Sequence, residues 1–114
     1  MSNPGKKWVV RDRYGNEIYL TEERWKHALE FHPELRGHLD DVLDTLRTGR
    51  RRQKLRQPNE YKYYKRCDSL PLNYNCIVVV VVFTYREQPD GSFAPNNFVK
   101  TAWGVYIYRF ERSN

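Results

Sequence analysis

The sequence predicts an α+β fold, in which an antiparallel sheet of about four to five strands carries two helices from the N-terminal half on one face. Two amphipathic segments precede several β-branched and aromatic segments, and connections rich in turn residues join the latter. Of the 114 residues, 39% are hydrophobic and 15% aromatic, which is enough to build a core. We therefore expect one domain over residues 1–114.

The first two strands form a predicted hairpin, which is followed by two helices. Trp8 to Asp12 and Glu17 to Leu20 read as short strands around a turn that contains glycine and asparagine. The first helix is capped by Thr21 and should end at about His32, because the proline that follows disfavours helical geometry there. A second helix is indicated from about Leu39 to Thr48 by apolar residues at helical spacing.

Three further strands are predicted in the second half of the chain. Tyr61 to Cys67 reads as a strand, and Cys76 to Tyr85 as a strongly β-branched central strand. Asn97 to Phe110 reads as a long final strand. Short connections between them favour antiparallel pairing.

Positive charge is concentrated in one window of the sequence. The formal net charge is +6, but residues 47 to 66 alone carry +8 and the rest of the chain carries −2. Cations at this density attract polyanions, and the tyrosines among them offer flat faces on which unpaired bases stack. Nucleic acid is therefore the first partner to consider. The same cations equally suit a solvated edge strand that resists aggregation.

The sequence shows no pattern typical of a zinc protein, a membrane protein or a secreted protein. Cys67 and Cys76 are too few for the usual zinc cage, and the three histidines lie far from them in the sequence, so we expect reduced thiols, no metal ligands and no cofactor. No stretch approaches the roughly 18 apolar residues of a membrane helix, and no signal or transit peptide is evident. We expect a cytoplasmic protein with no membrane contact.

Two histidines are candidates for acid/base chemistry. His27 and His32 lie five residues apart on the first helix, so at about 100° per residue they point to faces separated by roughly 140°. His32 shares the inward face, whereas His27 lies on the other flank. Both also have simpler interpretations: His32 as a core histidine that fixes the helix end, and His27 as a surface residue.

Two strand residues are candidates for holding a phosphate. Thr101 has the same parity as Val99 and Trp103, so its hydroxyl is expected on an otherwise apolar strand face. Lys65 shares a strand face with Tyr63 and could pair with a phosphate. Thr101 could equally be a strand residue bonded to the backbone, and Lys65 part of an exposed pattern.

These residue types suit a ribonuclease that works without a metal ion. One group removes the proton of the ribose 2′-hydroxyl, another protonates the leaving 5′-oxygen, and fixed cations stabilise the charged phosphorane. Histidine matches the proton transfers near neutral pH. Because no acidic cluster has two-metal spacing, metal-dependent hydrolysis is disfavoured.

Several segments between about Trp8 and Val105 together have the pattern of one family. They are the run from Ile18 to His27, Phe31-His-Pro-Glu-Leu35, Val42-Leu-Asp-Thr-Leu46, the Tyr-Tyr-Lys strand at Tyr63 to Lys65, a valine-rich strand and Phe98-Val-Lys-Thr-Ala-Trp103. In these segments the sequence resembles the phage-associated branch of the barnase–EndoU–colicin–RelE-like (BECR) ribonuclease superfamily.

The resemblance implies a BECR fold with an RNA-cleaving cleft on the sheet, and a toxin or mobile-element effector with an inhibitor protein of the antitoxin or immunity type. His27 and His32 match the motif histidines, Lys65 the cationic strand position and Thr101 the hydroxyl of the last strand. We expect an endoribonuclease in which a histidine, with His32 preferred, transfers protons while Lys65 and Thr101 hold the phosphate. The residues expected to bind RNA are Arg50, Arg51, Arg52, Lys54, Tyr63, Tyr64 and Arg66. The alternative is a non-catalytic RNA-binding or protein-interaction module that uses residues 47 to 66.

Overall fold

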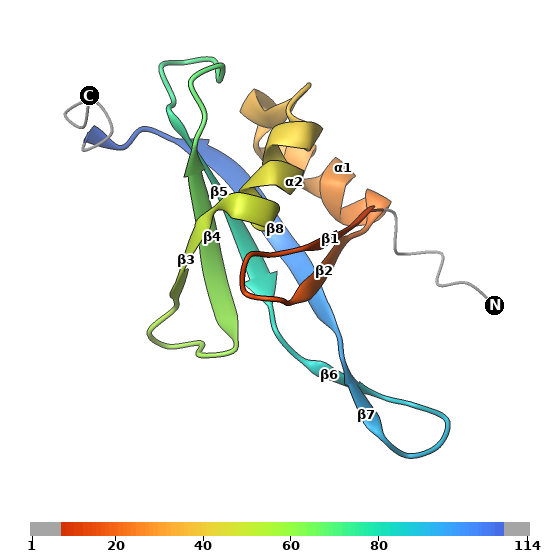
Figure 1. Cartoon of the computed structure of the whole chain (residues 1–114). Helices are drawn as coiled ribbons and strands as arrows, with labels where there is room; N and C mark the ends of the chain where they lie inside the picture. The colour runs from red at the N-terminus through yellow and green to blue at the C-terminus, as the bar shows by residue number, and fades with distance from the viewer. Residues whose placement is uncertain (1–7, 109–114) are drawn as a thin grey trace.

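The computed structural model describes residues 8–108, which form one six-stranded sheet, a separate two-stranded sheet, two α-helices and a short 3-10 helix (Figure 1). The elements follow in this order: β1 (Trp8–Arg11), β2 (Glu17–Leu20), α1 (Glu22–Phe31), η1 (Pro33–Leu35), α2 (Leu39–Thr48), β3 (Arg50–Gln53), β4 (Glu60–Arg66), β5 (Cys76–Val82), β6 (Tyr85–Glu87), β7 (Phe93–Pro95) and β8 (Asn97–Val105). Among the described residues, no helix is long and apolar enough to cross a membrane.

The large sheet has the order β1-β2-β8-β5-β4-β3. All its neighbours are antiparallel except β2 and β8, which pair in parallel at two positions, Ile18 with Asn97 and Tyr19 with Phe98. The predicted α+β class with a mostly antiparallel sheet is confirmed. The expected strand number was too low and the sheet is mixed, because β3 and the long-range pairing of β2 with β8 escape a local pattern.

The helix boundaries follow from local signals. Thr21 is the N-cap of α1, and its Oγ1 accepts a hydrogen bond from the backbone N–H of Arg24 at 3.0 Å. The helix ends before His32, as the proline at position 33 predicts. The bounds of α2 agree with the predicted second helix, and it buries the apolar stripe that contains Val42, Leu43 and Leu46.

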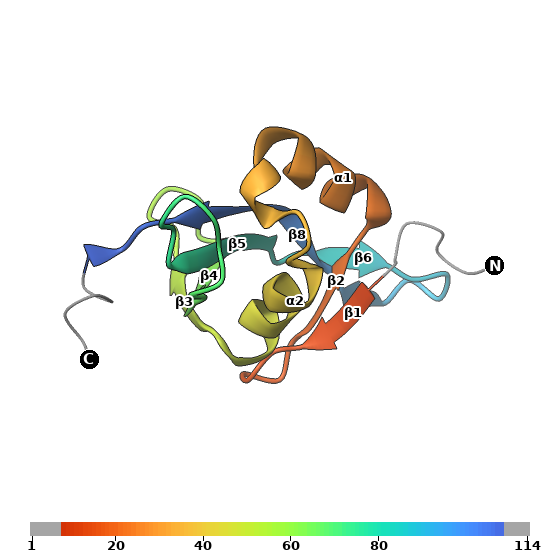
Figure 2. The same cartoon turned by 90° about the horizontal axis from the view of Figure 1, so that it is seen from above.

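The two helices lie on different sides of the sheet. The sheet curves around α2, which contacts β1, β4 and β5, while α1 lies outside the curve against β8 (Figure 2). The expectation that both helices cover one face was therefore wrong. The curved sheet wraps one helix on its concave side, and α1 packs Trp25 and Leu29 against the core from the other side.

A β-bulge in β8 changes which residues of that strand face the core. Val81 pairs with Val99 but Val80 pairs with Thr101, so Lys100 is an extra residue in the ladder. Val99 and Ala102 both reach the core as a result, and Thr101 turns to the opposite side from Val99. The expected shared parity of Thr101 and Val99 was wrong for this reason.

The predicted central and final strands are shorter than expected. The main ladder of β5 ends at Val82, and β6 and β7 form a separate hairpin that extends away from the large sheet (Figure 1). The strand β8 ends at Val105, and the last two residues of the predicted range Asn97 to Phe110 lie outside the described residues. The hairpin contains Pro95, which has no N–H to donate to a neighbouring strand, and most of its residues are exposed. Both features are unfavourable for extending the large sheet through these residues.

Candidate functional site

Alternation along β4 sorts the predicted site residues onto two sides of the sheet. Tyr63 lies in the core beside α2, so Lys65 faces the same side, whereas Lys62 and Tyr64 face away from α2. We call the side of β3, β4, β5 and β8 that is turned away from α2 the outer face. Its polar and aromatic side chains include Arg50, Arg52, Glu60, Lys62, Tyr64, Arg66, Phe98, Thr101 and Trp103.

Lys65 does not lie with Thr101. The Lys65 ammonium forms an ion pair with the carboxylate of Asp44 on α2, and it donates a hydrogen bond to Thr48 Oγ1 at 2.7 Å. Thr101 is across the sheet, where it pairs with Val80 on the outer face. The two residues expected to share one phosphate are thus separated by the sheet itself.

Arg51 and Tyr63, which we expected to bind RNA, belong to the framework on the α2 side. Tyr63 is fully buried, and its hydroxyl donates to the Asp12 carboxylate while accepting from Arg51 Nη1 at 3.3 Å. The Arg51 guanidinium lies over the rings of Tyr14 and Tyr61, 4.2 and 4.3 Å from their centroids. Neither side chain is available to a ligand on the outer face.

The Tyr63 contact also sets two protonation states. Burial, together with the hydrogen bond to Asp12, raises the pKa of the Tyr63 phenol well above its usual value. Burial alone would raise the pKa of Asp12, but hydrogen bonds from Tyr63, Asn16 and Tyr14 outweigh it and lower that pKa below 3.8. Asp12 is therefore an anion that holds Tyr63 and Arg51 in place.

Two other predicted cations are paired on or beside the outer face. Lys54 donates to the buried carboxylate of Glu60 at 2.8 Å, and Lys100 donates to the same carboxylate at 3.2 Å. The hydrogen bond from Lys54, opposed by burial and aided by Lys100, lowers the pKa of Glu60. Arg66 pairs with Asp68 at 3.0 Å. Charges at both ends of β4 are thus balanced by ion pairs.

The cations that stay available come from β3 and the centre of β4. Arg50 and Arg52 are exposed, and their side chains form no hydrogen bond or ion pair with the residues at positions 8–108. In the ladder, Arg52 lies opposite Lys62, and that row continues through Val80 to Thr101. The outer face therefore carries a row of two cations, an apolar residue and a hydroxyl.

A parallel row on the same face brings in aromatic rings. Arg50 lies opposite Tyr64, and the row continues through Val78 to Trp103. Lys62 lies over the Trp103 ring, with its Nζ 5.8 Å from the centroid. The sequence prediction missed Lys62 and Trp103, although the parity of Tyr64 already implied that Lys62 shares its face.

His32 lies at the edge of the outer face. Its ring centroid is 6.1 Å from that of Trp103, and its Nδ1 is 3.7 Å from Glu34 Oε2. The Glu34 carboxylate is itself fixed, because it accepts a hydrogen bond from the backbone N–H of Gly104 at 2.9 Å. A Cβ at Gly104 would lie 3.0 Å from the Glu34 side chain, so glycine permits this approach.

His27 is on the other flank of α1, as its spacing from His32 predicted. Its ring is exposed and lies against Phe31, with centroids 4.8 Å apart. The shallow pocket beside it is lined by Glu22, Glu23 and Glu30 together with one lysine. The negative charge of these glutamates disfavours the binding of a phosphate at His27.

A cluster on the α2 side could hold a metal ion. His38, Asp41 and Cys67 bring a nitrogen, an oxygen and a sulfur ligand atom within 4.8 Å of one another. The sequence argument against a metal site relied on the long separation between histidines and cysteines. The fold removes that separation, because β4 runs alongside α2.

None of the protein-family models, curated proteins or solved structures compared with this chain matches it. The resemblance to the BECR ribonucleases therefore stays a prediction. Of the four expected catalytic residues, the fold places Thr101 on the outer face and His32 at its edge, and it places Lys65 and His27 elsewhere.

Proposed function

We propose that this protein is an endoribonuclease that cleaves single-stranded RNA on the outer face without a metal ion. The observation that carries the proposal is the placement of His32 and Lys62 around the ring of Trp103, in the row next to Thr101. An imidazole, an ammonium, a hydroxyl and a stacking surface are the parts that RNA cleavage requires. Three separate elements contribute them: the C-terminal end of α1, β4 and β8.

RNA binding is assigned to the two rows of the outer face. The rings of Trp103 and Tyr64 offer stacking surfaces for unpaired bases, which is a sequence-tolerant way to bind a single strand. Arg50 and Arg52 would pair with backbone phosphates on the β3 side. Lys62 takes the place at the scissile phosphate that the sequence prediction gave to Lys65. The Thr101 hydroxyl donates a hydrogen bond to the same phosphate.

His32 is the group that we assign to proton transfer. Glu34 lies beside His32 Nδ1 and can orient the ring, which leaves Nε2 to accept the proton of the ribose 2′-hydroxyl. The 2′-oxygen then attacks phosphorus, and the bond to the 5′-oxygen breaks. The leaving oxygen takes a proton from the Lys62 ammonium, so the products are a 2′,3′-cyclic phosphate and a 5′-hydroxyl.

A second candidate function is RNA binding without cleavage. The observation that favours it is that two of the four expected catalytic residues lie away from the outer face: Lys65 is paired with Asp44 on the α2 side, and His27 is on the exposed flank of α1. Among the described residues, His32 is then the one histidine next to the outer face. In either case, an inhibitor protein of the kind that the resemblance implies would have to cover this basic face, and acidic side chains would suit it.

The test is an incubation of the full chain with end-labelled single-stranded RNA in EDTA. We expect cleavage, cyclic-phosphate ends, and no cleavage where the ribose is replaced by 2′-deoxyribose. His32→Ala should abolish cleavage by removing the base, whereas the same substitution at His27, on the exposed flank of α1, should retain it. Intact RNA bound by the wild-type chain would support the second candidate. Equal loss in both variants would reject the assignment of His32.

A further inference from the structure

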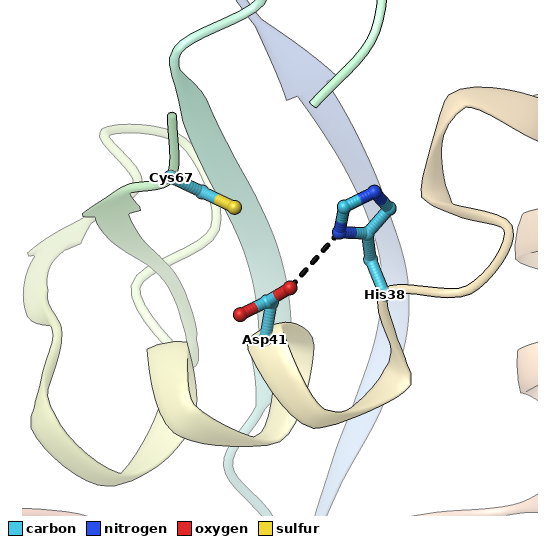
Figure 3. A group of neighbouring side chains, drawn as sticks. All are labelled: His38, Asp41 and Cys67. Atoms are coloured by element: carbon cyan, nitrogen blue, oxygen red, sulfur yellow. Dashed lines mark hydrogen bonds and ion pairs between the residues drawn. The ribbon is translucent and has the colours of Figure 1, made fainter. Parts of the chain in front are cut away.

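We propose that His38, Asp41 and Cys67 form a zinc site that ties the start of α2 to the end of β4. His38 is the N-cap residue of α2, Asp41 lies in its first turn, and Cys67 directly follows β4 (Figure 3). The proposal does not depend on the proposed ribonuclease function, because the three residues lie on the α2 side of the sheet.

The geometry is close to that of a bound ion. Three different ligand atoms lie within 4.8 Å of one another, and His38 Nδ1 is 2.9 Å from Asp41 Oδ2. In Figure 3 the Cys67 sulfur points toward the carboxylate and the imidazole. Zinc bonds of about 2.0 to 2.3 Å require only small shifts of the side chains to bring all three onto one ion.

The backbone already holds the ligands in place. The N–H of Cys67 donates to the carbonyl of Asn75 at 3.0 Å, and the N–H of His38 donates to the carbonyl of Leu35 at 2.8 Å. The carbonyl of His38 in turn accepts the first hydrogen bond of α2, from Val42 at 3.0 Å. A site with fixed ligands binds an ion without a large ordering cost.

The donor set selects the metal. A thiolate, an imidazole and a carboxylate suit zinc, whereas calcium and magnesium prefer oxygen ligands throughout. The His38 side chain is 15% exposed and that of Asp41 48%, so a water molecule can reach the fourth position of the tetrahedron. The simpler explanation is an ion pair of His38 with Asp41 at the start of a helix, beside a Cys67 thiol that shares a hydrogen bond with Ser69 Oγ at 3.5 Å. It does not explain why the Cys67 sulfur also lies within 4.8 Å of the other two ligand atoms.

The experiment is a titration of the metal-stripped full chain with cobalt(II), followed by its absorption spectrum. We expect one cobalt ion per chain, the visible bands of a tetrahedral ion and a thiolate-to-cobalt charge-transfer band, all removed by adding zinc. Cys67→Ser should abolish the charge-transfer band. Cys76→Ala is the matched control, because Cys76 is buried outside the cluster and its replacement should leave the band intact.

Two further variants test the other ligands. Loss of a group that only orients a metal ligand costs about 10- to 100-fold in affinity, so we expect His38→Gln and Asp41→Asn to weaken cobalt binding by at least about tenfold. His27→Gln and Asp44→Asn are their matched controls and should bind as the wild type does. Zinc should also raise the melting temperature of the wild-type chain and not that of Cys67→Ser.

The proposal is overturned if cobalt gives no charge-transfer band with the wild-type chain, or if the band persists in Cys67→Ser. A zinc-dependent rise in melting temperature that is equal in both proteins would also reject the site. Because the cluster is across the sheet from the outer face, removal of zinc should leave RNA cleavage intact below the melting temperature, which keeps the two proposals separable.

Discussion

Lys62 and Lys65 are three residues apart on the same strand and have opposite surroundings. Lys65 lies on the α2 side, where Asp44 and Thr48 occupy its ammonium group. Lys62 lies on the outer face, where its ammonium group contacts the Trp103 ring. The difference teaches that the side of the strand, rather than the density of charge along the sequence, decides which cation can meet a ligand.

The same contrast holds for the three consecutive arginines of β3. Arg51 stacks on tyrosines and bonds to Tyr63, whereas Arg50 and Arg52 are exposed on the other side. The charge of +8 over residues 47 to 66 therefore describes two populations. One population stabilises the fold, and the other is available for binding.

The largest effect on stability is expected from Asp12→Asn, which disrupts the hydrogen bonds around Tyr63 on the α2 side of the sheet. The substitution removes the buried anion that accepts hydrogen bonds from Tyr63 and Asn16 and leaves the nearby Arg51 cation without its charge partner. We expect a loss of about 2 to 3 kcal/mol in the free energy of unfolding. Urea denaturation at neutral pH measures it, and RNA affinity at a temperature where the variant is folded should be unchanged.

Acid offers a check on that assignment. The folded-state pKa of Asp12 is below its usual 3.8, so the carboxylate stabilises the fold above about pH 4 and the contribution is lost as the pH falls through the lowered pKa. Asparagine does not titrate. The stability difference between the wild type and Asp12→Asn should therefore shrink on acidification below about pH 4, and a constant difference would contradict the argument.

An intermediate effect is expected from the outer face with the double variant Arg50→Ala/Arg52→Ala. Each phosphate contact to a single strand contributes about 0.7 to the slope of log affinity against log salt, so the slope should fall by about 1.4. Near 0.15 M salt this corresponds to roughly tenfold weaker RNA binding. A fluorescence titration over a salt series measures both, and the melting temperature should stay nearly unchanged.

The smallest effect is expected from Lys65→Ala, and it sharpens the comparison most directly. The lysine is 39% exposed, so loss of its ion pair should cost at most about 1 kcal/mol, without a change in RNA affinity or cleavage. Lys62→Ala is the matched variant and should show the reverse: little change in stability and a loss of cleavage. Equal losses of cleavage in both variants would contradict the assignment of the scissile phosphate to Lys62 on the outer face.

Local signals predicted the helices well. Thr21 and the proline after His32 mark the ends of α1, and the apolar spacing marks those of α2. These features depend on neighbours within a turn or two of the chain, so the sequence carries them directly. The 140° separation of His27 from His32 is of the same kind and agrees with their different surroundings.

The candidate site could be predicted only in part, because it depends on pairings between distant segments. Thr101 faces outward because of the bulge at Lys100, which no periodicity in the strand announces. The framework role of Arg51 requires Asp12 from the first hairpin, and the cluster of His38 with Cys67 requires the packing of α2 beside β4. Such contacts are set by topology, which short-range patterns do not specify.

The placement of β8 in the sheet has a consequence for the order of assembly. The strand stands between β2 and β5, so segments from early and late in the chain become neighbours only when residues 97–105 take their place. On a ribosome, the hairpin of β1 and β2 and both helices emerge before the strand that joins them to β5 exists. A nascent chain would then carry Lys62 and His32 with no Trp103 between them, and the surface that we assign to RNA would form only as synthesis of β8 is completed.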